Sequence, residues 1–195
     1  MHHGQSTNGA TVMSFATQVL SQAARSALPI VTAAHRAPDT FGQLDGLSDL
    51  FLSNPVANRA SRAQGRGLLT AARQSFRDER EESLTSIEHA EQAHHLCFHH
   101  APVFGAVFAA LKIELIDTQR AFLFITVRSV AAAGVRLGLV GGFDAQQLQA
   151  VLAPEIDATI GRCGALLPTD IAQTAPLIDL CQSTHDRLYS RLFQS

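Results

Sequence analysis

The sequence of 195 residues contains no tryptophan, one tyrosine and only three cysteines. Cys97, Cys163 and Cys181 are odd in number and lie far apart, so they do not show the paired pattern of a disulfide framework. Structural disulfides are typical of oxidising compartments. The cysteine pattern therefore predicts a reducing, cytoplasmic location.

An excess of positive charge is also missing, because fifteen basic residues face seventeen acidic ones and the formal net charge is −2. Nucleic-acid binders and polybasic membrane-surface proteins need a basic field, so neither nucleic acid nor membrane is an expected partner. The most apolar stretch, 115–140, is interrupted by Asp117, Arg120, Arg128 and Arg136. A central Arg costs about 2.5–3.5 kcal/mol in a bilayer, so we interpret this stretch as a buried helix.

The composition instead favours a helical fold. Hydrophobic residues make up 46% of the chain and charged residues 16%, which excludes overall disorder. Alanine, the best helix former, is abundant, and alternating β-branched runs are scarce. We predict an all-α, single-domain bundle of about eight helices over 13–195, preceded by a disordered, unrelated segment at 1–12. The expected helices cover 14–34 (bent or ended by Pro29), 41–51, 54–76, 83–98, 103–113, 116–137, 144–163 and 175–191.

Three local signals set helix starts in this prediction. Asp39 is an expected cap for the second helix, and Asn54-Pro55 has the order of an N-cap followed by proline at the first helical position. Asp144, with Gln147 three residues later, resembles a capping box. The helix over 116–137 is apolar nearly all round, which predicts a central position.

Five of the nine histidines lie between His89 and His100. His95 and His99 are four residues apart, so on a helix they share a face and could chelate nickel or zinc. The spacing matches no closed zinc pattern, however. A solvated helix end, with one or two histidines near the turn before Pro102, is the simpler interpretation, and no metal site is predicted.

The sequence carries no strong catalytic motif. Cys97 lies between His95 and His99, but residues two apart on a helix point away from each other, which disfavours a thiolate–imidazole pair. Gly65 and Gly67 lie within a helical pattern rather than after a strand, so close helix packing explains them better than phosphate binding.

The C-terminal run 187–193 interleaves arginine with apolar and aromatic residues. Arginine and tyrosine are frequent in the energetic centres of interfaces. Apolar residues at a terminus usually pack somewhere. Two interpretations remain open at this point: a partner-binding tail, or a tail folded onto its own core.

Several blocks of the sequence resemble one family when taken in order. They are Ala63-Gln64-Gly65, His99-His100-Ala101-Pro102-Val103-Phe104-Gly105, Arg136-Leu137-Gly138-Leu139-Val140-Gly141, Gln173-Thr174-Ala175-Pro176-Leu177-Ile178-Asp179 and Tyr189-Ser190-Arg191-Leu192-Phe193-Gln194-Ser195. Together they resemble the urease accessory protein F (UreF) family over about residues 15–195.

The resemblance implies an all-α protein with no enzyme activity and no cofactor of its own. It implies a scaffold that binds the UreD/UreH-type accessory protein, recruits and modulates the GTPase UreG, and supports nickel insertion into apo-urease, with a homodimer inside the complex. The implied partner-binding residues are Arg187, Tyr189, Ser190, Arg191, Leu192, Phe193 and Ser195. The motif residues without an assigned role are Gln64, Gly65, His99, His100, Pro102, Gly105 and Arg136.

Two further expectations accompany the resemblance. The family's usual N-terminal segment, of the form Leu-Asp-Ser-x-Leu-Pro-x-Gly-Gly-Phe-x-His-Ser, has no counterpart in the right place, so we expect an N-terminally truncated or divergent member. The alternative function is a nickel-binding, metal-handling protein that uses the His89–His100 cluster.

Overall fold

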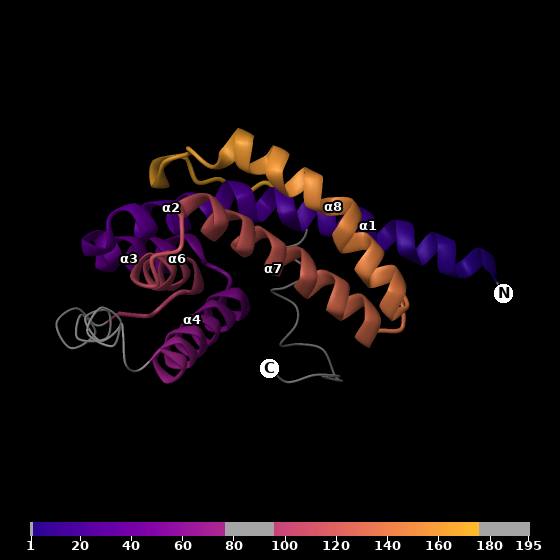
Figure 1. The fold of residues 1–195 in the computed structure, drawn as a ribbon, viewed down its shortest axis with the longest axis horizontal. Coiled ribbons are helices and arrows are strands. Elements are labelled where there is room, and N and C mark those ends of the chain that lie inside the picture. Colours follow the sequence, from indigo (N-terminus) through magenta and orange to yellow (C-terminus); the bar gives the residue numbers. More distant parts are fainter. Residues whose placement is uncertain (1, 77–95, 176–195) are drawn as a thin grey trace. The chain divides into compact units, whose positions relative to one another are not determined.

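The computed structural model describes residues 2–76 and 96–175, and within these ranges it contains helices and no strand. The all-α prediction is confirmed. The elements are α1 (His2–Ser26), α2 (Leu28–Arg36), η1 (Pro38–Thr40), α3 (Phe41–Phe51), α4 (Pro55–Ser75), α6 (His100–Ala110), α7 (Leu115–Arg136), α8 (Gly142–Cys163) and η2 (Pro168–Asp170) (Figure 1). The expected helix over 175–191 lies almost entirely outside the described residues, as does most of the one over 83–98.

The described residues form two compact units: 2–29 with 116–174, and 30–76 with 96–115. The first unit contains α1, α7 and α8. Its helices α7 and α8 run antiparallel and are joined by a short loop (Figure 1). The Gln119 side-chain amide of α7 donates a 2.8 Å hydrogen bond to the carbonyl oxygen of Gly164, which ties α7 to the end of α8.

Helix α1 begins well before the expected start at residue 14. Residues 2–12, which the sequence indicated as a disordered segment, belong to this helix. Val12 is buried and lies beside Gly134 of α7. The helix ends at Ser26 and α2 begins at Leu28 with Pro29 in its first turn, so the predicted break near Pro29 is confirmed.

Helix α7 has nearly the predicted bounds, and only part of its apolar surface is buried; its central position stays a prediction. Phe124 and Ile125 are about 40% exposed, whereas Leu123 and Val127 are fully buried. The helix therefore buries one face only. Among the described helices, none is both long enough and apolar enough to cross a membrane.

The start of α8 differs from the predicted capping pattern. The helix begins at Gly142, and Asp144 lies inside its first turn rather than at the cap. The Asp144 carboxylate accepts a 3.0 Å hydrogen bond from the backbone N–H of Gly141. Asp144 was expected at the N-cap position of a capping box. It instead occupies the third helical position, from which its side chain reaches back to the backbone N–H of the N-cap residue Gly141.

The second unit is built around α6, whose residues 101–107 are all buried. This helix packs against α3 and α4. The buried cluster around it consists of Phe41, Leu69, Ala72, Leu96, Phe98, Val103, Ala106, Val107 and Leu111. Gly105 lies directly against the backbone of α2 near Val31, where a side chain would not fit. The close approach of α2 therefore depends on glycine at this position.

The helix starts in this unit follow the sequence signals only in part. Asn54 is the N-cap of α4, and its side-chain oxygen accepts hydrogen bonds from the backbone N–H groups of Val56 and Ala57, as predicted. Asp39 does not cap α3. It lies in η1, and the N-cap position is occupied by Thr40, whose side chain makes no capping bond within the described residues.

Candidate functional site

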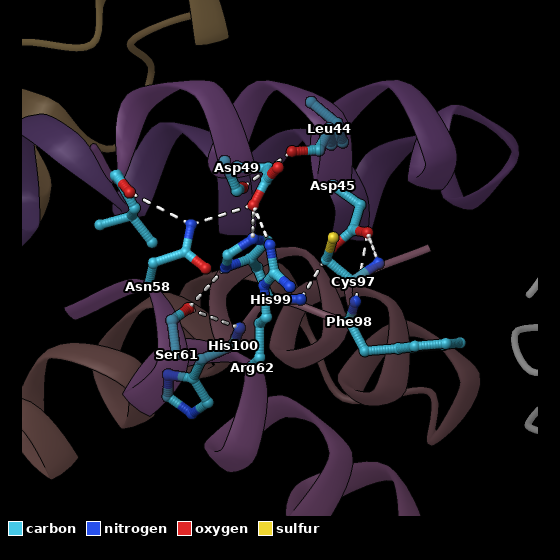
Figure 2. Close-up of polar contacts among 12 residues, drawn as sticks. Leu44, Asp45, Asp49, Asn58, Ser61, Arg62, Cys97, Phe98, His99 and His100 are labelled. Atoms are coloured by element: carbon cyan, nitrogen blue, oxygen red, sulfur yellow. Dashed lines mark hydrogen bonds and ion pairs between the residues drawn. The ribbon is translucent and has the colours of Figure 1, made fainter. Parts of the chain in front are cut away.

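The family-like motif around His99 lies at a junction of three segments: α3, α4 and the stretch 96–100 that leads into α6 (Figure 2). Residues 96–99 are not helical, so the prediction of a helix extending to Phe98 is wrong for its last residues. Helix α6 instead begins at His100, three residues before the predicted start. This short irregular stretch carries most of the polar contacts of the site.

Asp45 of α3 holds the irregular stretch by its backbone. Its carboxylate accepts hydrogen bonds from the N–H groups of Cys97 at 2.6 Å, Phe98 at 3.1 Å and His99 at 2.7 Å (Figure 2). The side chain is 2% exposed. Three donors that a helix would have satisfied internally are therefore satisfied by one buried carboxylate.

A close contact between α4 and this stretch fixes its position from the other side. Phe98 has a positive φ of 58°, and its carbonyl group faces Gly65 of α4. A Cβ atom added at Gly65 would overlap the Phe98 carbonyl oxygen and lie 3.0 Å from the carbonyl carbon of His99. Glycine at this position allows the two backbones to touch.

Asp49, one turn after Asp45 on α3, is the centre of a second network (Figure 2). Its Oδ1 atom accepts hydrogen bonds from Asn58 Nδ2 at 2.9 Å, Arg62 at 2.6 Å and His99 Nε2 at 3.1 Å. The His99 side chain is fully buried, whereas Asp49 and Arg62 are each about 40% exposed. The network therefore reaches from the interior to the surface.

Ser61 completes the contacts of the two histidines. Its Oγ lies 3.1 Å from His99 Nδ1 and accepts a hydrogen bond from the backbone N–H of His100 at the same distance. When the neutral His99 ring donates its Nε2–H to Asp49, its Nδ1 atom accepts a hydrogen bond from the Ser61 hydroxyl. The His100 ring packs edge-on against Phe104, with ring centroids 5.6 Å apart.

The surroundings shift the pKa of several side chains at this junction. Hydrogen bonds from Asn58, Arg62 and His99 hold the pKa of Asp49 well below its ordinary value. Burial lowers the pKa of His100, which favours its neutral form. Burial, together with the nearby Asp49 charge, raises the pKa of the Cys97 thiol. The thiol is therefore protonated at neutral pH, which disfavours a nucleophilic role.

Acid should weaken the fold through Asp49. Because its pKa is depressed in the folded state, its stabilising effect is present above the ordinary aspartate pKa of about 3.9 and is lost as the pH falls further. Its exposure limits the effect to about 1 kcal/mol. We expect the urea midpoint of the protein to fall more steeply below about pH 4 than that of the Asp49→Asn variant. Parallel curves for the two proteins would contradict this assignment.

The geometry also brings together three possible metal ligands, Asp49, Cys97 and His99, whose donor atoms lie within 4.8 Å of one another. The prediction that Cys97 and His99 point away from each other is wrong, because it assumed a helix there. The predicted His95–His99 face also requires a helix through His99, which instead has an extended backbone at the N-cap of α6. The rest of the cluster at 89–95 lies outside the described residues.

The motif residues divide between the two units. Gly65, His99, His100, Pro102 and Gly105 all belong to the second unit, and Gln64 is on the exposed side of the same helix as Gly65. Arg136 is exposed at the end of α7 in the first unit. The predicted partner-binding residues of the tail, Arg187, Tyr189, Ser190, Arg191, Leu192, Phe193 and Ser195, lie outside the described residues.

Sequence reasoning missed four residues that organise the site: Asp45, Asp49, Ser61 and Arg62. Asp45 and Asp49 are four apart and so share a face of α3, and Asp45 lies on the buried side of this helix next to Leu44. An acidic residue on the apolar face of an amphipathic helix is a signal that a buried partner exists. The sequence does not indicate which backbone groups, more than fifty residues away, supply that partner.

Comparison with known proteins finds the same family as the sequence blocks described above. The sequence model of the UreF family matches residues 6–153. The chain is 34% identical to urease accessory protein F of Oryza sativa subsp. japonica over 192 residues, which covers 95% of this chain and 72% of the relative. It is 36% identical to urease accessory protein F of Arabidopsis thaliana over 180 residues, or 91% and 74%. Identity to urease accessory protein UreF of Trichodesmium erythraeum is 32% over 146 residues, or 74% and 62%.

Proposed function

Because this chain belongs to the UreF family of urease accessory proteins, we propose that it acts as a non-catalytic scaffold in urease maturation. The observation that carries this proposal is the match to accessory proteins over more than nine-tenths of the chain. In the proposed role the protein works in the cytoplasm and needs no cofactor of its own. Its unpaired thiols at Cys97 and Cys163 suit a reducing compartment.

The interior placement of the motif residues supports a scaffold role. His99, Pro102 and Gly105 are buried, and their contacts shape the junction of α3, α4 and α6. Motif residues that serve a reaction would be expected in a cleft open to substrate. Residues that fix the shape of a helical unit suit a protein whose work is to present a surface.

The proposed partners are a UreD/UreH-type accessory protein, the GTPase UreG and apo-urease, with two copies of this chain in the complex. In this proposal the tail residues 187–195 contact the partners. A scaffold changes a GTPase only by binding one of its nucleotide states more tightly than another. We therefore propose that the assembled scaffold favours the state of UreG that releases nickel to apo-urease.

Co-purification tests the proposal. The full chain is expressed with a UreD/UreH-type protein and UreG, and the mixture is separated by size exclusion. We expect the three proteins to elute together, and we expect deletion of residues 189–195 to remove UreG or the whole partner set. A monodisperse, helical full-length protein that elutes alone would contradict the scaffold role.

A pair of single substitutions separates a tail contact from a general loss of charge. Arg191→Ala lies in the proposed contact segment, whereas Arg128→Ala removes an exposed arginine from α7. We expect the first variant to weaken co-elution and the second to leave it unchanged. Equal effects of the two variants would contradict a specific role for the tail.

A further inference from the structure

We propose that Asp49, Cys97 and His99 form a binding site for a divalent transition metal of the zinc class. The three donor atoms are a carboxylate oxygen, a sulfur and an imidazole nitrogen, and they lie within 4.8 Å of one another. Zinc binds all three donor types, and the combination of sulfur and nitrogen selects against magnesium and calcium. The proposal does not depend on the scaffold role.

The spacing of the donors fits a tetrahedral ion. Asp49 Oδ1 and His99 Nε2 are 3.1 Å apart. Oxygen and nitrogen ligands of tetrahedral zinc lie about 2.0–2.2 Å from the ion and therefore roughly 3.3 Å from each other. A separation of this size needs almost no change to admit the metal. The Cys97 sulfur lies within 4.8 Å of a carboxylate oxygen of Asp49 and of a ring nitrogen of His99, so it has to move closer to complete the set.

The backbone that carries two of the ligands is held in place before any metal binds. Asp45 accepts hydrogen bonds from the N–H groups of Cys97, Phe98 and His99. The side chains of Cys97 and His99 therefore extend from backbone that these bonds hold in place. Because Phe98 between them has a positive φ, the stretch is not helical and the two side chains lie on the same side. Ligands on fixed backbone lose little conformational freedom when the metal binds.

Ser61 provides the contact that a metal-bound histidine needs on its other nitrogen. When His99 Nε2 binds the ion, the neutral ring changes tautomer: the Nε2 proton is released to solvent and Nδ1 takes one up. The Cys97 thiol also releases its proton to solvent as the sulfur binds, so metal binding releases one proton in all and strengthens as the pH rises. Ser61 Oγ, 3.1 Å from Nδ1, then accepts the Nδ1–H of the His99 ring. A hydrogen bond of this kind orients the ring and is typical of histidine ligands in metal sites.

Arg62 is the group that the metal replaces. Its guanidinium donates a 2.6 Å hydrogen bond to Asp49 Oδ1, the atom that would bind the ion. The Arg62 side chain is 40% exposed, and its buried Nε has no hydrogen-bond partner among the described residues. A half-exposed ion pair is a weak interaction, so the guanidinium can move into solvent when the metal binds. The half-exposed edge of the site leaves the fourth position to water.

Titration of the full-length protein with Co²⁺ tests the site, because a cobalt–thiolate bond gives a charge-transfer absorption in the near ultraviolet that histidine ligands alone do not give. We expect this absorption to saturate at one ion per chain and to be displaced by Zn²⁺. Cys97→Ser should abolish it, whereas the matched control Cys163→Ser should retain it. Zn²⁺ should also raise the Tm of the protein, and this shift should be lost in Cys97→Ser.

Arg62→Gln provides a second test, because a network with a purely structural role would show no gain in metal affinity when Arg62 is replaced. Removal of the competing cation should tighten Co²⁺ and Zn²⁺ binding up to about fivefold, the factor that corresponds to loss of a half-exposed ion pair. Absence of the absorption, its persistence in Cys97→Ser, or unchanged affinity in Arg62→Gln would each overturn the proposal. Binding without the thiolate absorption would assign the metal to other histidines of the chain and would equally overturn it.

Discussion

Replacement of Gly65 by alanine is expected to destabilise the protein by about 3 kcal/mol. The new Cβ would overlap the carbonyl oxygen of Phe98, and the atoms it meets are backbone atoms that no rotamer change can move. Phe98 itself is held by Asp45 and by its burial in the core around α6. Relief of the overlap therefore requires α4 to separate from the start of α6. Urea unfolding followed by circular dichroism measures the effect.

Gly67 provides the matched control because it lies two residues further along the same helix. A Cβ added at Gly67 meets nothing within 4 Å. Alanine is the better helix former by about 1 kcal/mol, so Gly67→Ala should stabilise the protein by up to that amount. The two glycine substitutions should thus have opposite signs. Equal destabilisation by both would show that the contact between Gly65 and Phe98 does not limit the packing.

Loss of the Asp45 carboxylate should have an effect of similar size. Asp45→Ala leaves three N–H groups without their acceptor, those of buried Phe98 and His99 and that of part-buried Cys97, and an unsatisfied buried donor costs about 1–3 kcal/mol. We expect a loss of about 4 kcal/mol in the free energy of unfolding, since part of the penalty is relieved by water and local movement. Asp45→Asn keeps one acceptor oxygen and should be intermediate. The same urea experiment measures all three proteins.

Asp144 provides the matched control, because its carboxylate accepts one backbone hydrogen bond where that of Asp45 accepts three. Its carboxylate accepts one exposed N–H, that of Gly141. Asp144→Ala should therefore cost about 1 kcal/mol, as for the loss of an ordinary helix cap. If Asp45→Ala costs no more than Asp144→Ala, the three hydrogen bonds at the start of α6 contribute little to stability.

The parts of the fold that could be predicted from the sequence are those set by neighbouring residues. Asn54-Pro55 begins α4 as expected because an N-cap and the first helical position act within four residues. The bounds of α7 follow from an apolar, alanine-rich stretch that ends near Gly138. Asp39 shows the limit of such signals. The three residues Pro38–Thr40 take a 3-10 turn, and this moves the cap position to Thr40.

The irregular stretch before α6 could not be predicted because distant residues stabilise it. Local propensity continues a helix through Phe98, and nothing nearby in the sequence opposes that interpretation. The helix is avoided because Asp45 satisfies the three N–H groups and Gly65 receives the Phe98 carbonyl. Both partners lie on helices far earlier in the chain. Tertiary contacts here outweigh local preference.

The candidate site illustrates the same division. His99 and His100 were singled out from the motif, and they do lie at the centre of the polar contacts. Their roles could not be assigned, because the motif does not show that Asp49 and Ser61 face the His99 ring. Cys97 and His99 lie near each other because the backbone between them is not helical, and residue spacing alone does not indicate this. The residue types at 97 and 99 indicate which chemistry is available there. The backbone conformation of Phe98, which brings the two side chains together, is not indicated by the sequence.

The Asp45 contact also bears on the order in which the second unit assembles. Asp49 joins Asn58 and Arg62, which are only 9 and 13 residues away, whereas Asp45 reaches residues 52 to 54 positions away. Closing a longer loop costs more chain entropy, so the α3–α4 pair should form early and capture the start of α6 later. Unfolding then begins with release of the 96–99 stretch. A contact that forms after the folding transition state slows unfolding without affecting folding. Asp45→Ala should therefore raise the unfolding rate constant and leave the folding rate constant nearly unchanged.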